Sequence, residues 1–393
     1  MIIHSVECKT RDGRRRLSAV VELEGRKASF PKTRSAAQEL WFDWPEDYLS
    51  LETAKADPFV LVCFPLAMRL GERLKVEGAV SQDLILNVLE AMSIYHSYFP
   101  AYASPVGIEA NGEYRVKSSS KRVGSFYSGG VDSLYNIAEL KRLGAVHGAL
   151  PFTDLWLVQG MDIGLDQIGL WEETKSKIFD QISADDGLRY ADIRTNARDI
   201  HERYVNWTKM GFSVILGAIA KCFSDDIPTA LIGSYAKYED IIPHASSPLV
   251  DPMWSCDQQQ VRHFSCRVNR QEKINTVGEV TPHLLAGLRV CYENPDEAYN
   301  CGTCEKCMRT QAQLLLGGHL GKARSFQHTL NAEALLKLNL PWKRGNEYTW
   351  DFWRDIAKSF REAGEIEFAQ ALDEAFKRSR RKRSIMRITR WRK

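Results

Sequence analysis

The stretch FYSGGVDS at residues 126–133 constrains the fold of this 393-residue chain more than any other. A short apolar run at residues 123–127 leads into it, and a helix-like run follows at residues 134–143. A strand that turns sharply into a helix leaves several backbone N–H groups without partners at the helix start. Those groups and the helix dipole together favour an anion. The stretch therefore predicts an α/β domain with a phosphate-binding turn.

Each residue type in this turn suits a phosphate ligand. Glycines let the backbone come close to a ligand because they carry no Cβ, and the two serines add hydroxyl donors. A carboxylate beside phosphate makes sense if a divalent cation bridges the two, or if it caps local N–H groups. We therefore predict that six consecutive residues hold the nucleotide: Ser128, Gly129, Gly130, Val131, Asp132 and Ser133.

Two rival nucleotide signatures are missing. A Walker loop needs the pattern GxxxxGK[ST], but the nearest string, at residues 317–323, has the wrong spacing and no hydroxyl residue. The dinucleotide fingerprint GxGxxG is absent from residues 124–133. The turn at residues 126–133 is therefore neither a Walker loop nor a dinucleotide-binding loop.

Strand and helix patterns alternate from residue 122 onward. This rhythm predicts an α/β fold with a doubly wound parallel sheet, in which ligands bind at the carboxyl ends of the strands. The expected strands are at residues 123–127, 155–158, 188–193 and 229–233.

The remaining chain suggests two flanking regions. Residues 1–120 read as an N-terminal α+β accessory module, with a buried strand at 59–64 and a helix at 82–98 that Ser81 caps. Residues 121–330 form the expected nucleotide-binding domain, which includes the cysteine segment described below, and residues 331–393 form the helical C-terminal region with a basic tail.

Four cysteines crowd into a short irregular segment at about residues 289–310. Four thiolates are the ligand number of a closed tetrahedral zinc site, and the two-residue gaps can wrap one metal ion. An iron–sulfur cluster also takes four cysteines, but nothing else in the chain suggests redox chemistry. We predict a structural zinc site made by Cys291, Cys301, Cys304 and Cys307.

Composition and charge set broader limits. Hydrophobic residues make up 44% and charged residues 26%, as in ordinary globular proteins. The longest apolar runs are too short to cross a bilayer, and no signal-peptide pattern is present, so a cytoplasmic protein without membrane contact is expected. The net charge is +3, yet residues 377–393 hold ten Lys and Arg and no acid, which leaves −7 on the rest. Such a tail can bind nucleic acid, or it is a helix end docked on the acidic body.

The string SGGVDS resembles the signature of the PP-loop ATP pyrophosphatases. That family binds ATP on a sheet of the adenine-nucleotide α-hydrolase-like (HUP) type, activates a carboxyl or carbonyl-type oxygen by adenylation and releases pyrophosphate. The resemblance implies ATP and Mg²⁺ as cofactors. The family includes GMP, NAD and asparagine synthetases, tRNA thiolases and QueC, the 7-cyano-7-deazaguanine synthase.

The cysteine string Cys-Tyr, a gap and then Cys-Gly-x-Cys-x-x-Cys resembles QueC, whose four cysteines bind zinc. Both motifs occur here in the order that the family has, over roughly residues 122–315. QueC itself is shorter and lacks a region like residues 1–120. The pattern Thr195-Asn196-x-Arg198 is closer to QueC-like proteins of bacterial antiphage systems (QatC-like or CBASS-associated). The chain thus resembles a defence-type paralogue.

Single-residue roles follow from the resemblance and from position. Lys273 and Arg309 are candidates for neutralising charge in the transition state, or else a surface lysine and a helix cap. Asp162 and Arg198 are expected near the nucleotide. Asp251 is either a hydrogen-bond acceptor for a guanine-like ring or a loop residue. The full expected substrate-binding set is Ser234, Ser246, Ser247 and Asp251.

Several other residues have no expected role in chemistry. No spacing links the histidines to one another, and no cationic setting is evident beside the remaining cysteines, so all are interpreted as structural. These residues are His201, His263, His283, Cys222, Cys256 and Cys266. The related substrate loops resemble Gly-Ser-His-Pro, whereas this chain has Ala245-Ser-Ser-Pro248 with His244 upstream, so the sequence leaves open whether His244 replaces their histidine.

The resemblance implies an ATP-dependent ligase. It would adenylate the carboxylate of a 7-carboxy-7-deazaguanine-like small molecule and pass the acyl group to an amine. In the defence homologues that amine belongs to a protein's N-terminus, which implies a protein partner from the same operon; in QueC it is ammonia. The alternatives are RNA-base modification that uses the basic tail, and a nucleotide-sensing scaffold without turnover.

Overall fold

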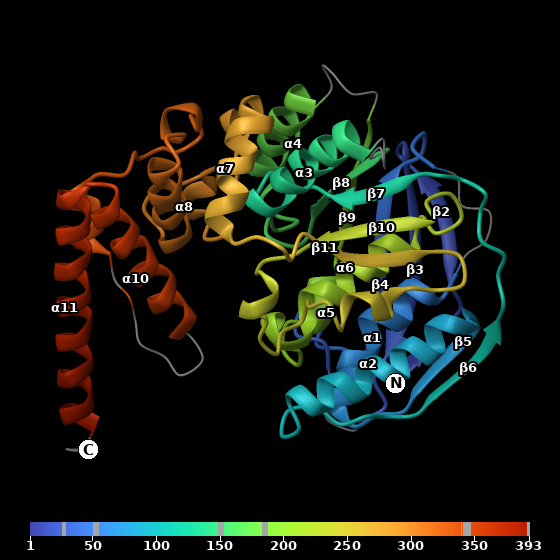
Figure 1. Ribbon diagram of the computed structural model, residues 1–393. Helices are drawn as coiled ribbons and strands as arrows, with labels where there is room; N and C mark the ends of the chain where they lie inside the picture. Colours follow the sequence, from blue (N-terminus) through green and yellow to red (C-terminus); the bar gives the residue numbers. More distant parts are fainter. Residues whose placement is uncertain are drawn as a thin grey trace. The chain divides into compact units, whose positions relative to one another are not determined.

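The computed structural model describes residues 1–25, 29–49, 55–147, 153–182, 188–338, 340 and 347–390, without the side chains of 347, 348 and 381–390. The described chain forms two compact units (Figure 1). One comprises residues 1–128 and 132–270, and the other comprises residues 129–131 and 271–393. The domain boundaries expected near residues 120 and 330 stay a prediction.

The first unit is built on a large sheet flanked by helices. Its strands are β1 Ile2–Ile3, β2 Glu7–Arg11, β3 Arg14–Glu22, β4 Ala37–Pro45, β5 Leu74–Ser81, β6 Ile108–Glu113, β7 Val123–Phe126, β8 Asp154–Gln159, β9 Arg189–Thr195, β10 Thr229–Gly233 and β11 Gln260–Phe264. Its helices are α1 Asp57–Leu70, α2 Gln82–Tyr98, α3 Val131–His147, α4 Ile168–Ile182, α5 Ala197–His201 and α6 Phe212–Lys221.

The described strands form one sheet in the order β11-β10-β7-β8-β9-β4-β3-β1-β5-β6, with β2 paired to β3. The five strands from β7 to β11 pair in parallel, whereas β9 meets β4 in antiparallel fashion. Along the chain, β8 and β9 follow β7 on one side, and β10 and β11 lie on its other side. This order is that of a doubly wound sheet. The predicted α/β class and parallel strands are confirmed.

One predicted element is wrong. Residues 59–64 were expected as a buried strand, but they lie inside α1, which is buried from Asp57 to Met68. An apolar run that is buried all round shows neither the helical nor the strand period, so periodicity alone cannot separate the two. Pro58 in the first helical turn and the left-handed Gly71 just after the end are typical helix boundaries.

The N-terminal region is continuous with the parallel sheet. The expected helix at residues 82–98 is confirmed as α2, and the Ser81 hydroxyl accepts a hydrogen bond from the Leu84 N–H at its start. The β4–β9 pairing joins Phe42 to Thr195 and so merges the N-terminal strands with the rest. One hydrophobic core runs through the whole of this unit. Long-range strand pairing of this kind leaves no local signal in the sequence.

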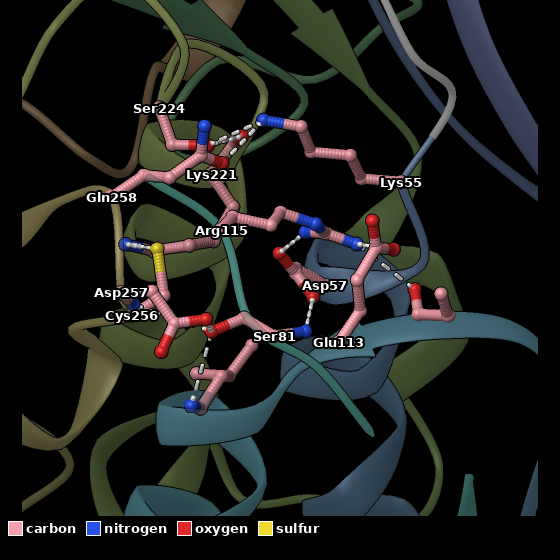
Figure 2. Close-up of polar contacts among 12 residues, drawn as sticks. Lys55, Asp57, Ser81, Glu113, Arg115, Lys221, Ser224, Cys256, Asp257 and Gln258 are labelled. Atoms are coloured by element: carbon pink, nitrogen blue, oxygen red, sulfur yellow. Dashed lines mark hydrogen bonds and ion pairs between the residues drawn. The ribbon is translucent and has the colours of Figure 1, made fainter. Parts of the chain in front are cut away.

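Buried ionic contacts reinforce this junction (Figure 2). Asp57, fully buried at the start of α1, accepts a hydrogen bond from the Ser81 N–H (2.8 Å) and pairs with the Arg115 guanidinium (2.6 Å). Ser81 also donates from its hydroxyl to Asp257 (2.8 Å). Both oxygens of the Asp57 carboxylate are therefore compensated, as burial of a charge requires.

Two buried lysines occupy the same region (Figure 2). The Lys55 ammonium donates to Ser224 (3.1 Å) and to Gln258 (2.8 Å). Lys221 is fully buried, and its Nζ lies 3.5 Å from the Cys256 sulfur. Burial lowers the pKa of Lys221. These contacts connect the end of α6 with the loop before β11.

The second unit is helical. Its helices are α7 Arg270–Val280, α8 Glu305–Leu316, α9 Ala332–Lys337, α10 Glu347–Glu362 and α11 Ile366–Arg390. The predicted helical C-terminus is confirmed, and Leu372 and Ala375 of α11 lie in a separate core. Most of the basic tail's side chains, from residue 381 on, lie outside the described part, so its binding role stays a prediction. Among the described residues no helix is long and apolar enough to cross a membrane.

We predict that Asp57→Ala lowers the free energy of unfolding by about 3 kcal/mol, because it leaves the Arg115 charge without its buried partner. Urea unfolding followed by circular dichroism measures the change. Glu7→Ala, which removes an exposed ion pair with Lys9, is the matched control and should cost less than about 1 kcal/mol. Equal losses in the two variants would contradict this interpretation.

Candidate functional site

The glycine turn has the local structure that the sequence predicted. β7 ends at Phe126 and α3 begins at Val131. Gly129 has a φ of 71°, a left-handed conformation that favours glycine. Ser128 is exposed, Ser133 is buried and the Asp132 side chain is about one third exposed. The turn thus leads into the first turn of a seventeen-residue helix, whose N-terminal end carries the positive end of the helix dipole.

This turn lies at the position where the strand order of the sheet reverses. β7 pairs with β8 on one side and with β10 on the other. In doubly wound sheets ligands bind outside the carboxyl ends of the strands at this position. Gly233, at the end of β10, packs against α3: a Cβ there would stand 2.9 Å from the Asn136 amide nitrogen. Asn136 also accepts a hydrogen bond from Ser265, just beyond β11 (2.8 Å).

Two predicted nucleotide-binding residues follow β8 and β9 at the same edge. Asp162 is exposed just after β8. Arg198 in α5 donates to the backbone oxygen of Met161, and its guanidinium carbon lies 4.6 Å from the centre of the Trp207 ring. The parallel pairing of β8 and β9 therefore brings the Asp162 and Arg198 segments together.

Thr195 and Asn196, which belong to the same motif as Arg198, have a structural role that the sequence did not indicate. Asn196 donates to the backbone oxygen of Glu39 (2.7 Å) and accepts from the Trp41 N–H (2.9 Å). The Thr195 hydroxyl donates to the Trp41 oxygen (2.7 Å). These bonds fix β9 to β4.

The predicted substrate-binding residues are buried and hydrogen-bonded within the protein. Asp251 accepts from Ser213 (2.5 Å) and Ser246 (2.7 Å), and its Oδ2 lies 2.6 Å from Nδ1 of His263. The Ser247 hydroxyl accepts from the Val250 N–H. The other residue of the set, Ser234, donates to the Ala236 oxygen (2.6 Å). Both Asp251 oxygens are engaged, so contact of this carboxylate with a guanine-like ring stays a prediction.

His263 and Cys266 join this cluster although they were interpreted as structural. Burial lowers the pKa of His263, but the hydrogen bond with Asp251 and the proximity of Cys266 outweigh it and raise that pKa to about 9. Cys266 donates from its thiol to the Ser234 hydroxyl (3.1 Å). Sequence analysis missed both residues because it did not recognise β11, whose pairing with β10 places Ile232 beside His263.

The predicted catalytic set is divided between the units. Ser128, Asp132 and Ser133 belong to the first unit, where Asp132 lies 3.5 Å from the Arg270 guanidinium. The other two members belong to the second unit. Lys273 is buried in α7. Arg309 in α8 forms an ion pair with Glu305, with 2.9 Å between Nε and the carboxylate oxygen. Its guanidinium carbon lies 4.9 Å from the centre of the Phe352 ring. A common catalytic centre stays a prediction.

The four predicted metal ligands converge in the second unit. The Sγ atoms of Cys291, Cys301, Cys304 and Cys307 all lie within 4.8 Å of one another. The Sγ atom of Cys291 lies 3.7 Å from that of Cys301 and 3.9 Å from that of Cys304. The Sγ atoms of Cys301 and Cys307 are 3.9 Å apart. A zinc–sulfur bond of about 2.3 Å in a tetrahedron places sulfurs about 3.8 Å apart. The cluster therefore fits a single tetrahedral metal ion, and it is the one such group among the described residues.

Neighbouring polar groups hold these cysteines in place. The buried Asn300 accepts hydrogen bonds from the N–H groups of Val290 (2.8 Å) and Cys291 (3.1 Å), and it donates to the Leu288 oxygen (2.7 Å). Gly302 has a φ of 76°, and a Cβ there would collide with the His328 backbone at 2.2 Å. The bend between the second and third ligands thus requires glycine.

Without a metal ion, the cysteine thiols of this cluster differ in pKa. Hydrogen bonds from Cys304 and Cys307 lower the pKa of Cys291, whereas the contact with Cys291 raises the pKa of Cys304 to about 12 and that of Cys307 as well. Four sulfurs this close stabilise one thiolate at the expense of the others. A bound dication removes this conflict because it favours all four thiolates.

The cysteine segment is attached to the glycine turn by one backbone hydrogen bond. The N–H of Arg289 donates to the Gly129 oxygen (2.9 Å). Arg289 stands two residues before the first metal ligand, Cys291. Order in the metal segment therefore bears on the conformation of the turn.

Comparison of the chain with protein-family models, curated proteins and solved structures gives no match.

We predict that the purified protein carries one zinc ion per chain and that Cys301→Ser reduces its zinc content to less than about a tenth, because a closed site needs all four ligands. Elemental analysis after gel filtration measures this. Cys222→Ser, which removes a buried thiol outside the cluster, is the control and should retain the metal. Equal zinc content in all three proteins would show that the cluster is not the site.

Proposed function

We propose that this protein is a PP-loop ATP-dependent ligase of the QueC-like type. It adenylates the carboxylate of a 7-carboxy-7-deazaguanine-like substrate with release of pyrophosphate, and an amine then receives the acyl group. One observation carries the proposal: the SGGVDS turn joins β7 to α3 at the reversal point of a doubly wound sheet. A turn at this position presents backbone N–H groups to an anion.

The turn has suitable groups for holding the triphosphate. The N–H groups of the first turn of α3 and the hydroxyls of Ser128 and Ser133 donate to phosphate oxygens. Arg270, which lies 3.5 Å from Asp132, adds positive charge. Asp132 and Ser133 offer the oxygen ligands that Mg²⁺ prefers. When bound, that ion neutralises charge on the phosphates.

The chemical step is an in-line displacement. A carboxylate oxygen of the substrate forms a bond to the α-phosphorus, the bond from that phosphorus to the bridging oxygen breaks, and pyrophosphate leaves with the electron pair. The donors of the turn stabilise the charge that develops on the phosphoryl oxygens. Asp162 and Arg198, at the ends of β8 and β9, are the proposed contacts for the rest of the nucleotide.

The metal has a structural role in this proposal. Four protein ligands complete a tetrahedral zinc site and leave no open position for a substrate. Because Arg289 binds the Gly129 oxygen next to this segment, zinc would stabilise the turn indirectly. Lys273 and Arg309 remain proposed donors to transition-state charge.

The acceptor amine is proposed to be the N-terminus of a protein, as in the defence-type homologues. Support for this comes from the resemblance of residues 195–198 and from the additional N-terminal region, whose strands are integrated into the sheet. Ammonia is the alternative acceptor and would give 7-cyano-7-deazaguanine.

We predict pyrophosphate release that depends on both ATP and 7-carboxy-7-deazaguanine. Asp132→Asn should lower its rate about 100-fold, because charge stabilisation at the phosphates is lost. A coupled pyrophosphatase assay measures the rate. Asp12→Asn, in the exposed turn between β2 and β3, is the control and should match the wild type. Release that needs no carboxylate, or formation of ADP instead of AMP, would contradict the proposal.

A further inference from the structure

A buried amine and a buried thiol face each other in the first unit. Lys221, at the end of α6, is fully buried, and Cys256, in the loop before β11, is 8% exposed. Figure 2 shows these two side chains, whose Nζ and Sγ atoms lie 3.5 Å apart. Sulfur is a weak hydrogen-bond acceptor and donor, so this contact is a hydrogen bond. It joins segments that are 35 residues apart in the sequence.

The Cys256 sulfur is the one hydrogen-bond partner of the Lys221 amine among the described residues. A buried charge without a partner is costly, so buried lysines are paired or become neutral. The neighbouring Lys55 has a more usual set of oxygen partners, since its ammonium reaches Ser224, Gln258 and the Asp225 carboxylate. An amine that depends on a single sulfur calls for an explanation beyond packing.

The charge of the amine depends on that sulfur. Burial has the largest effect on Lys221 and lowers its pKa. Cys256 has the largest effect in the opposite direction, ahead of the buried Asp57 carboxylate, whereas the charge of Lys55 lowers the pKa further. Oxidation of the sulfur to an uncharged sulfenic acid removes the main support for the proton. The amine then becomes neutral and nucleophilic.

The other cysteines of the same hydrophobic core have no amine beside them. The Cys222 thiol donates to the Ala218 oxygen within α6 (3.5 Å), and Cys63 has no hydrogen-bond partner among the described residues. Burial raises the pKa of both thiols. A nearby ammonium stabilises a thiolate, and the thiolate is the form that oxidants attack. Within this core, Cys256 is therefore the cysteine whose surroundings favour oxidation.

We propose that Lys221 and Cys256 form a redox-sensitive modification site, in which hydrogen peroxide joins the two side chains through a sulfur–nitrogen bond. This inference does not rest on the proposed function. A thiolate oxidises to a sulfenic acid, and a sulfenic acid condenses with a nearby nitrogen to a sulfenamide. Here the nitrogen already lies 3.5 Å from the sulfur, on a flexible side chain.

The reaction balances in two steps. The Cys256 thiolate attacks one peroxide oxygen, the oxygen–oxygen bond breaks, and hydroxide leaves with the electron pair and takes a proton from the Lys221 ammonium. The neutral amine then attacks the sulfur of the sulfenic acid, the sulfur–oxygen bond breaks, and the departing hydroxide takes a second proton from the nitrogen. Sulfur is oxidised by two electrons and the peroxide is reduced to water. The joined side chains consequently lack two hydrogen atoms.

The bond would link the end of α6 to the loop before β11. β10 and β11 pair in parallel from their first residues, Thr229 and Gln260. The link therefore lies near the amino ends of these strands, whereas ligands bind at the carboxyl ends in such sheets. A covalent bond between distant residues restricts the unfolded chain, as a disulfide does. The expected consequence is a more stable first unit, which a thiol reductant returns to its original state.

Peptide mapping of the protein as purified tests the link directly. Hydrogen peroxide should produce a cross-linked peptide that contains Lys221 and Cys256, lacks two hydrogen atoms and disappears after treatment with dithiothreitol. The Cys256 thiol should be lost at least about tenfold faster than the Cys222 thiol. Equal rates for the two thiols, or a Cys256 that ends only as sulfinic acid, would overturn the proposal. The wild-type protein alone gives this result, so no variant has to fold.

Two variants separate the roles of the amine and the thiol. Lys221→Met removes the amine but keeps an unbranched side chain, so peroxide should form no link. Dimedone should then capture the Cys256 sulfenic acid at least about fivefold more than in the wild type, because no amine competes for it. Cys222→Ser is the matched control and should form the link as the wild type does. Equal dimedone capture in Lys221→Met and the wild type would show that the amine does not react.

Thermal unfolding measures the consequence for stability. Peroxide should raise the Tm of the wild type by at least about 5 °C relative to its effect on Lys221→Met, and dithiothreitol should abolish this gain. Both proteins contain the cysteine segment of residues 291–307, so oxidation of its thiols affects them equally. The same shift in both proteins would contradict a stabilising link between Lys221 and Cys256.

Discussion

The parallel pairing of β7 with β10 is the constraint on which the candidate site depends. It places β8 and β9 on one side of β7 and β10 and β11 on the other, so the chain winds in both directions from one strand. The carboxyl ends of these five strands consequently meet at one edge. The glycine turn and the Asp251–His263 pair lie at the strands of this region because of this pairing and not because they are close in the sequence.

The cysteine segment adds a second constraint in the helical unit. The distances between its sulfur atoms fit a single tetrahedral ion. Asn300, which directly precedes the second ligand, accepts a hydrogen bond from the backbone N–H of the first ligand, Cys291. The hydrogen bond from Arg289 to the Gly129 oxygen links this order to the turn. The order of the cysteine segment thus extends by one backbone hydrogen bond to a residue of the glycine turn.

Local patterns were predictable from the sequence, and long-range ones were not. The glycine turn, α2 with its Ser81 cap and the four cysteines each lie in one short segment of the sequence, and all agree with the structure. The prediction of a strand at residues 59–64 was wrong because a fully buried helix shows no hydrophobic periodicity in its sequence. The β4–β9 and β10–β11 pairings join distant segments. Without them the role of Asn196 in fixing β9, and the meeting of His263 with Asp251, could not be foreseen.

Transfer of oxygen from the substrate to AMP tests the central claim most directly, because adenylation leaves a carboxylate oxygen on the α-phosphorus. 7-Carboxy-7-deazaguanine labelled with ¹⁸O in its carboxylate should be turned over with ATP and an amine, and the AMP examined by mass spectrometry. Our account predicts one ¹⁸O atom in each AMP formed. Unlabelled AMP, or label found in inorganic phosphate together with ADP, would contradict carboxylate adenylation at the SGGVDS turn.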